Sequence, residues 1–181
     1  MAVWFWQFLF YSFLGFVFEV FFARAVHNPK RDRKCRYFLP LCPVYGLGAV
    51  AVLLLPEHLR SHPVVFFLCA AALCTVVEYA TALFYEKALG VSFWDYTQLP
   101  LNFGGRVCLP FSLLWGLLSL LLLWITQPYA AGLAGALPPW LLPPAVLFFF
   151  ADSAWSFFLL RRTQDTASLR WYARLGARRT A

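Results

Sequence analysis

Five long apolar stretches recur along the chain, and short polar or basic segments separate them. An α-helix rises about 1.5 Å per residue, so about 20 apolar residues cross a hydrocarbon core about 30 Å thick. We therefore expect about five transmembrane helices, at residues 3–23, 38–55, 63–85, 107–125 and 140–160. The predicted fold class is an all-α, polytopic integral membrane helical bundle. Residues 1–160 form its membrane domain, and residues 161–181 form a basic cytoplasmic tail.

The composition favours a membrane protein over a soluble one. Hydrophobic residues make up 62% of the 181 residues and charged residues 13%, against roughly 25% charged residues in a soluble domain. The N-terminus lacks a basic n-region and a cleavage site, so we expect the first helix to be retained. We expect a multi-pass protein of the cell's inner or plasma membrane.

The net charge of +7 comes from clustered basic residues. Anionic lipid headgroups are sufficient partners for such clusters. A nucleic-acid partner would require a basic folded face, which the sequence does not show. Membrane lipids are therefore expected partners, and nucleic acid is not.

The distribution of basic residues predicts the orientation of the chain. With five spans, the connections after spans one and three lie on the same side as the C-terminal tail. Of the 15 Lys and Arg residues, six lie in residues 24–36, two are Lys87 and Arg106, and six lie in the tail, so that side holds 14. Basic loops stay cytoplasmic. The N-terminus is therefore expected outside and the C-terminus inside.

Acidic residues inside the expected spans are candidate functional residues. Glu19, Glu78 and Asp152 each lie in an apolar helix, and Glu86 lies at the end of one. An ionisable residue at a helix centre costs roughly 2.5–3.5 kcal/mol on insertion scales, so it faces other helices rather than lipid. Ser12 shares a helix face with Glu19. In the predicted orientation these groups gather in the cytoplasmic half, as a cavity open to the cytoplasm requires.

The connection between the third and fourth spans carries further candidates. Asp95, Asn102 and Arg106 are its polar residues, and Trp94 and Tyr96 flank Asp95. Such aromatic residues are common at membrane interfaces, and the alternative is a re-entrant cap over a membrane site. Arg106 could be the counter-ion of a membrane acid, an anion clamp at a helix start, or an ordinary positive-inside anchor.

Signatures of enzymes and metal sites are missing from the sequence. It contains no P-loop, no HExxH and no GxSxG, and its three histidines form no cluster. The five cysteines show no CxxC pair and no Cys/His ligand spacing, so we expect no metal and no cofactor. A non-enzymatic role is favoured.

Short motifs through the first four spans resemble one family. They are Tyr11-Ser12-Phe13-Leu14-Gly15 with Glu19, Cys42-Pro43-Val44-Tyr45-Gly46, Glu78-Tyr79, Glu86-Lys87, Trp94-Asp95-Tyr96, Leu101-Asn102 and Gly105-Arg106-Val107-Cys108. In this order they resemble the small bacterial membrane proteins grouped as CmpB-like, type IV ABC transporter permeases. The resemblance implies a helical membrane protein and, through the family's label, transport with a separate ATPase. Cys42, Tyr45 and Cys108 join the candidates as supporting residues.

Three functions stay open on the sequence. The first is a permease subunit in which Glu19, Glu78 and Arg106 line a cytoplasm-facing path. It needs a separate ATPase, and a homo-oligomer is favoured because five spans are few for a permease half. The second is a membrane enzyme that acts on lipid or isoprenoid headgroups, with Glu78 and Glu86 as acid and base. The third is a scaffold or regulator whose polar core is structural, with Arg106 paired to Glu78 or Glu19.

Overall fold

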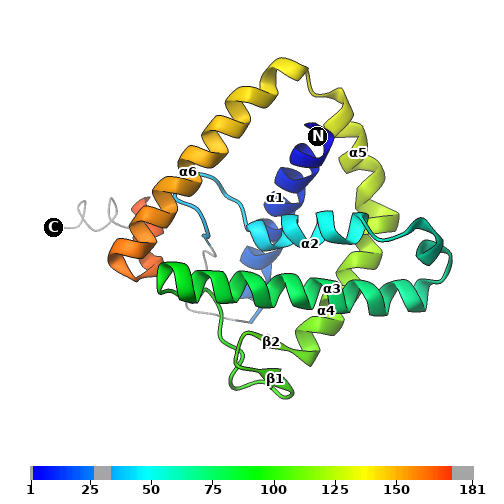
Figure 1. The fold of residues 1–181 in the computed structure, drawn as a ribbon, viewed down its shortest axis with the longest axis horizontal. Coiled ribbons are helices and arrows are strands. Elements are labelled where there is room, and N and C mark those ends of the chain that lie inside the picture. Colours follow the sequence, from blue (N-terminus) through cyan, green and yellow to red (C-terminus); the bar gives the residue numbers. More distant parts are fainter. Residues whose placement is uncertain (1, 27–33, 173–181) are drawn as a thin grey trace.

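The computed structural model describes residues 2–26 and 34–172 and shows a helical protein with one small hairpin (Figure 1). Its α-helices are α1 (Ala2–Ala25), α2 (Pro43–Leu53), α3 (Pro63–Phe84), α4 (Leu109–Leu121), α5 (Gln127–Ala136) and α6 (Leu142–Thr163). Short 3₁₀ turns lie at Glu57–Ser61, Pro139–Leu141 and Thr166–Leu169, and π-helical turns at Tyr85–Leu89 and Leu122–Thr126. Strands β1 (Asn102–Phe103) and β2 (Val107–Cys108) pair antiparallel.

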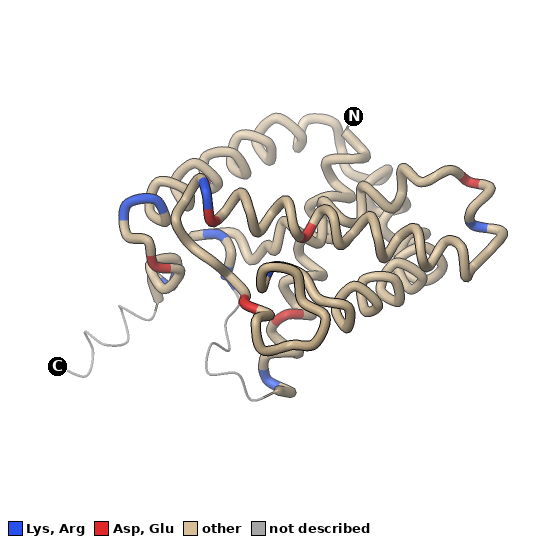
Figure 2. The backbone as a smooth tube through the Cα atoms, turned by 60° about the horizontal axis from the view of Figure 1, so that its bottom comes forward, with Lys and Arg blue, Asp and Glu red and all other residues tan. Residues whose placement is uncertain are grey.

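Four helical stretches of the described residues are long and apolar enough to cross a membrane, which confirms the predicted all-α membrane bundle. They are Ala2–Ala25, Pro63–Leu89, Leu109–Ala136 and Pro139–Thr163. Large apolar side chains cover their outer surface, as lipid-facing helices require. Charged residues lie mostly at helix ends and in connections, and long helical stretches carry none (Figure 2).

The second expected span is shorter than predicted. Within residues 38–55 only Pro43–Leu53 is α-helical, which is 11 residues and about 16 Å. The chain before it is not helical, because a residue that precedes proline avoids the α conformation and both Pro40 and Pro43 impose this. The orientation predicted from charge treats this stretch as a full crossing, and that orientation stays a prediction.

The fourth helix is longer than predicted. It runs over Leu109–Ala136, whereas the sequence indicates a neutral loop at 126–139. Pro128 is tolerated because it stands in the first turn of α5, directly after a π-helical turn. The polar residues that suggested a loop are satisfied inside the bundle, where the Tyr11 hydroxyl donates to Gln127 Oε1 at 2.7 Å.

The start of the predicted tail folds back onto the bundle. Leu169 in the turn Thr166–Leu169 is fully buried and packs in one cluster with Leu160 of α6 and Tyr85 at the end of α3. Residues 173–181, where the rest of the predicted tail falls, lie outside the described residues. The cytoplasmic placement of the tail stays a prediction.

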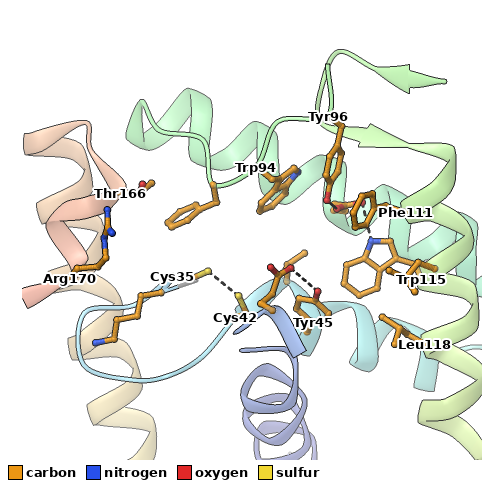
Figure 3. Close-up of a pocket in the computed structure, with 16 residues that line it drawn as sticks. Cys35, Cys42, Tyr45, Trp94, Tyr96, Phe111, Trp115, Leu118, Thr166 and Arg170 are labelled. Atoms are coloured by element: carbon orange, nitrogen blue, oxygen red, sulfur yellow. Dashed lines mark hydrogen bonds between the residues drawn. The ribbon is translucent and has the colours of Figure 1, made fainter. Parts of the chain in front are cut away.

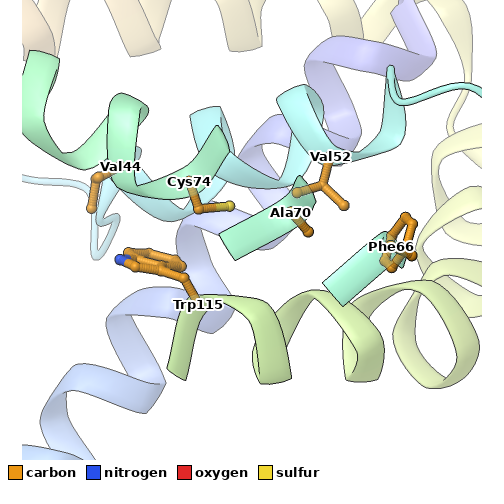
Figure 4. Close-up of a cluster of buried hydrophobic side chains, with 6 residues drawn as sticks. All are labelled: Val44, Val52, Phe66, Ala70, Cys74 and Trp115. Carbon is orange, nitrogen blue, oxygen red and sulfur yellow. The ribbon is translucent and has the colours of Figure 1, made fainter. Parts of the chain in front are cut away.

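Helix α2 packs between α1 and α3, and glycines permit its close approach to α1 (Figure 1). A Cβ atom added at Gly46 would lie 2.2 Å from Ser12 Oγ, and one at Gly15 would lie 2.1 Å from Tyr45 Cγ. Small residues of this kind let membrane helices meet backbone to backbone. On its other side α2 joins α3 and α4 through a buried cluster (Figure 4): Val44, Val52, Phe66, Ala70, Cys74 and Trp115.

Asp152 of α6 holds the non-helical segment that leads into α2. Its side chain is 2% exposed. Its two carboxylate oxygens accept the backbone N–H groups of Phe38 at 2.9 Å and Leu39 at 3.0 Å, and Ser156 Oγ accepts that of Tyr37 at 2.9 Å. These bonds satisfy N–H groups that a helix would otherwise satisfy. Asp152 is therefore an anchor of this segment.

Replacing Asp152 with alanine is expected to destabilise the fold by roughly 3 kcal/mol or more, since two hydrogen bonds to a buried charged group are lost at about 1.5–3 kcal/mol each. The measurement is the thermal unfolding midpoint of the purified protein in detergent. Ser153→Ala is the matched control, because the Ser153 hydroxyl is also buried and bonds to the Phe149 carbonyl of its own helix. Equal shifts for the two variants would contradict the anchoring role.

Candidate functional site

A pocket of about 70 Å³ lies where the helix bundle meets the link between α3 and α4, residues 90–108 (Figure 3). Figure 3 shows Tyr45 and Trp115 at one end and Arg170 at the other, with the thiols of Cys35 and Cys42 between them. Residues from α1, α2, α3 and α4 contribute to its wall. The site is therefore assembled from segments that are far apart in the sequence.

The first carboxyl group of the pocket is Glu19, on the polar stripe of α1. The Tyr45 hydroxyl, from the first turn of α2, donates to Glu19 Oε1 at 2.8 Å. The Tyr45 ring lies against Gly15, which is one helical turn before Glu19 and has no side chain to displace it. The close approach of α1 and α2 at Gly15 thus places the hydroxyl on the carboxyl group.

The second carboxyl group is Glu78 of α3, which is 4% exposed. Its Oε1 accepts the Tyr96 hydroxyl and its Oε2 accepts Trp115 Nε1, each at 3.0 Å. The Trp115 ring packs on the Tyr45 ring with a centroid separation of 4.8 Å. Glu19 and Glu78 are thus neighbours in one aromatic pocket, each with fixed donors.

Tyr96 reaches Glu78 from the link. Its ring stacks on Phe111 with centroids 4.7 Å apart, and its backbone N–H donates to the Gly105 carbonyl at 2.8 Å. Burial, and then the charge of the Glu78 carboxyl group, raises the pKa of Tyr96 above its usual value. The phenol therefore stays protonated at neutral pH and donates its proton in the bond to Glu78.

Asp95 and Asn102 shape the link rather than line the pocket. Asp95 Oδ1 accepts the Thr97 backbone N–H at 2.9 Å, which is a local turn contact of the kind that Asp favours. The Asn102 side chain donates to the Leu99 carbonyl at 2.8 Å and accepts the Gly105 N–H at 3.2 Å. Both residues hold the backbone that carries Trp94 and Tyr96.

Glu86 and Arg106 form a separate ion pair. Arg106 Nε donates to Glu86 Oε2 at 2.9 Å, and the two side chains are 24% and 30% exposed for Arg106 and Glu86. The hydrogen bond with Glu86 raises the pKa of Arg106 above its usual value. Trp94 bonds to the same region, where its Nε1 donates to the Arg106 carbonyl at 2.8 Å. Neither Glu86 nor Arg106 lines the pocket.

The structure thus divides the sequence-predicted candidates into two groups. Those that line the pocket are Glu19, Cys42, Tyr45, Glu78, Trp94 and Tyr96. Those that lie elsewhere are Ser12, Glu86, Asp95, Asn102, Arg106, Cys108 and Asp152. Of this second group, Ser12 and Cys108 are buried and use their carbonyls as acceptors, for Cys42 N and Ser112 Oγ. In the described part of the chain, no three His, Cys, Asp or Glu side chains are placed to hold a metal ion.

Sequence reasoning missed several pocket residues. Trp115 is absent from the candidates, although an indole N–H in an apolar helix needs an acceptor, and that is a usable signal. Cys35 stands in the basic connection before the second expected span, and no CxxC spacing marks it there. In the sequence, Lys34 and Arg170 are only members of the basic clusters, yet both line the pocket. Figure 3 shows Arg170 at the end away from Trp115.

The comparisons with known proteins agree with this architecture. A family model described as "Putative ABC-transporter type IV" matches residues 6–158, a range that includes both pocket carboxyl groups. Neither the comparison with curated proteins nor that with solved structures gave a match. With four membrane-length apolar helices in its described residues, the protein is a multi-pass membrane protein. Because the match covers most of the chain, the protein belongs to the type IV family of ABC-transporter-related membrane proteins, the CmpB-like family that its motifs resemble.

Proposed function

We propose that the protein is the membrane subunit of an ABC-type transport system in the cell membrane, and that its pocket is the substrate site. The observation that carries this proposal is that Glu19 and Glu78, from two different membrane helices, line one small pocket. Ionisable groups at such positions mark substrate or ion pathways in membrane proteins. The predicted orientation would open the pocket toward the cytoplasm.

The chemistry of the pocket favours a small cation. Carboxylate oxygens accept the N–H groups of an ammonium ion, and the faces of Tyr and Trp rings attract cations. A cavity of about 70 Å³ has room for a small ammonium ion or a few waters, since one water needs about 10–15 Å³. A substrate that also carried an anionic group would meet Lys34 and Arg170, which line the same pocket.

The energy for transport would come from a separate ATPase subunit. The sequence carries no P-loop, and the family's label is that of ABC transporters. A second copy of the chain would complete the membrane part, since the four long apolar helices and one short one found among residues 2–26 and 34–172 are few for a full pathway. The ATPase and the second copy are both part of the proposal.

The geometry gives less support to the two other hypotheses. An enzyme with Glu78 and Glu86 as acid and base would need both groups at one site, whereas Glu78 bonds to Tyr96 and Trp115 and Glu86 bonds to Arg106. A scaffold role was expected to pair Arg106 with Glu78 or Glu19. Arg106 instead pairs with Glu86.

The test of the proposal is purification of the tagged protein from its native membrane in mild detergent. We expect an ATP-binding protein in a stoichiometric complex, with ATP hydrolysis that an ammonium cation stimulates. The control is the complex with Glu78→Gln, in which basal hydrolysis should persist and the stimulation should fall. Isolation of a homo-oligomer without ATPase activity would overturn the ABC assignment.

A further inference from the structure

Two cysteines face each other in the wall of the pocket. The Sγ atoms of Cys35 and Cys42 are 3.0 Å apart, and the two residues are 8% and 4% exposed. Figure 3 shows both thiols beside the pocket, between Tyr45 and Arg170. A disulfide has an S–S distance of about 2.05 Å, so the sulfurs would need to approach by only about 1 Å. We propose that Cys35 and Cys42 are a redox-active dithiol that closes to an intrachain disulfide.

The contact between the two sulfurs is held from both sides. The Cys42 backbone N–H donates to the Ser12 carbonyl of α1 at 2.9 Å, and the Cys42 carbonyl accepts the Tyr45 N–H at 3.1 Å. Two residues after Cys35, the Tyr37 N–H donates to Ser156 of α6 at 2.9 Å. Helices at both ends of the segment 35–42 therefore bring the thiols together.

The surroundings of Cys74 are different and make it a suitable comparison. It is as buried as Cys42, at 2% exposed. Its sulfur faces the Ser119 hydroxyl at 3.8 Å and the Gly48 carbonyl at 4.0 Å. Neither group is a thiol, so neither can form a disulfide with Cys74. Cys74 also lines a cavity, of about 220 Å³, so access of small solutes does not separate the two sites. What separates them is the facing group, because the sulfurs of Cys35 and Cys42 face each other, whereas that of Cys74 faces a hydroxyl and a carbonyl group.

The reaction balances with a hydroperoxide as oxidant. One thiolate attacks hydrogen peroxide, the O–O bond breaks, and a sulfenic acid and hydroxide form. The second thiolate then attacks the sulfenic sulfur, the S–S bond forms, the S–O bond breaks, and a second hydroxide leaves. With the two thiol protons, two thiols and one peroxide give one disulfide and two waters. A dithiol reductant reverses the reaction by exchange.

The disulfide would tie the segment 35–42 to the start of α2. The first turn of α2 carries Tyr45, which donates to Glu19. Oxidation would therefore stiffen the wall of the pocket beside Glu19. In the predicted orientation the thiols face the cytoplasm, where glutathione and thioredoxin keep cysteines reduced. The pair would then close only under oxidative stress and would reopen afterwards.

Trypsin provides a direct test, because it cleaves after Lys34, Arg36 and Arg60 and so separates Cys35 from Cys42. The purified wild-type protein is treated with hydrogen peroxide, its remaining thiols are alkylated, and it is digested without reductant. We expect the dipeptide 35–36 to remain attached to the peptide 37–60 in most of the protein, with a combined mass two hydrogens below the sum. Dithiothreitol should release it.

Variants decide whether the link is specific. Cys42→Ser should abolish the linked peptide, and Cys74→Ser should leave it unchanged. Separate alkylated peptides 35–36 and 37–60 after peroxide treatment would overturn the proposal. The wild-type digest gives this result even if a variant fails to fold. No transport is measured, so the outcome is independent of the proposed function.

Discussion

Replacing Glu78 with glutamine is expected to raise the concentration of ammonium cation needed for half-maximal thermal stabilisation by about 10- to 100-fold. A hydrogen bond to a charged group contributes roughly 1.5–3 kcal/mol, and about 1.4 kcal/mol is a factor of ten in affinity. The measurement is thermal unfolding of the purified protein during titration with ammonium or methylammonium chloride, whose cations carry N–H donors. N-methylglucamine chloride, whose cation is too bulky for the pocket, keeps the ionic strength constant.

The variant should retain its fold, which makes this result interpretable. A glutamine side chain keeps one acceptor for Trp115 Nε1, and its NH₂ group can donate to the Tyr96 hydroxyl, which accepts as well as donates. Glu86→Gln is the matched control, since it makes the same chemical change on the same long helix outside the pocket. An unchanged titration for Glu78→Gln would exclude Glu78 as a ligand. Equal losses in both variants would indicate a general effect of charge.

Replacing Gly46 with alanine is expected to destabilise the protein by about 3 kcal/mol, at the upper end of over-packing effects. The added Cβ would lie 2.2 Å from Ser12 Oγ and 2.5 Å from the Phe8 carbonyl oxygen. Backbone cannot yield by changing rotamer, so α1 and α2 must separate. That movement takes the Tyr45 hydroxyl away from Glu19, so stabilisation by the cation should fall as well. Both effects are read from the thermal unfolding midpoint in detergent.

Gly48→Ala is the control for this prediction, on the same helix two residues further on. Its added Cβ would meet Cys74 Sγ at 3.4 Å, an ordinary contact. Alanine is favoured over glycine in a helix by about 1 kcal/mol, so this variant should be unchanged or more stable. A similar loss of stability for both variants would show that a methyl group added at either glycine of α2 is destabilising, whatever its distance from α1. No loss for Gly46→Ala would contradict the close approach.

The acidic residues show how far the sequence leads toward the site. The energetic cost of a carboxyl group in a membrane helix is a property of that helix alone, so the one-dimensional pattern is enough to single out Glu19 and Glu78. Their partners are not local. Arg106 pairs with the partly exposed Glu86, because a guanidinium group loses less hydration there than beside the buried Glu78.

The short helix α2 shows how far hydropathy leads toward the fold. Residues 38–55 are apolar enough for a full span, and the local signals against it are Pro40 and Pro43, which are tolerated near the start of a helix. The segment before α2 is held in a non-helical conformation by Asp152, which bonds to the N–H groups of Phe38 and Leu39 more than 110 residues away in the chain. Such a bond competes with a helical hydrogen bond, and no window of sequence contains both partners.

From the sequence alone we could infer the membrane environment, the helical class and the family, and single out both pocket carboxyl groups, Glu19 and Glu78. These follow from quantities that add along a single helix, namely apolar length, charge and the cost of an ionised group in hydrocarbon. Three features became visible only in the tertiary structure. They are which candidates share a pocket, that α2 is only about half as long as a membrane span, and that Cys35 lies against Cys42. These depend on distances between segments, and such distances follow from how closely the helices pack, as at Gly15 and Gly46.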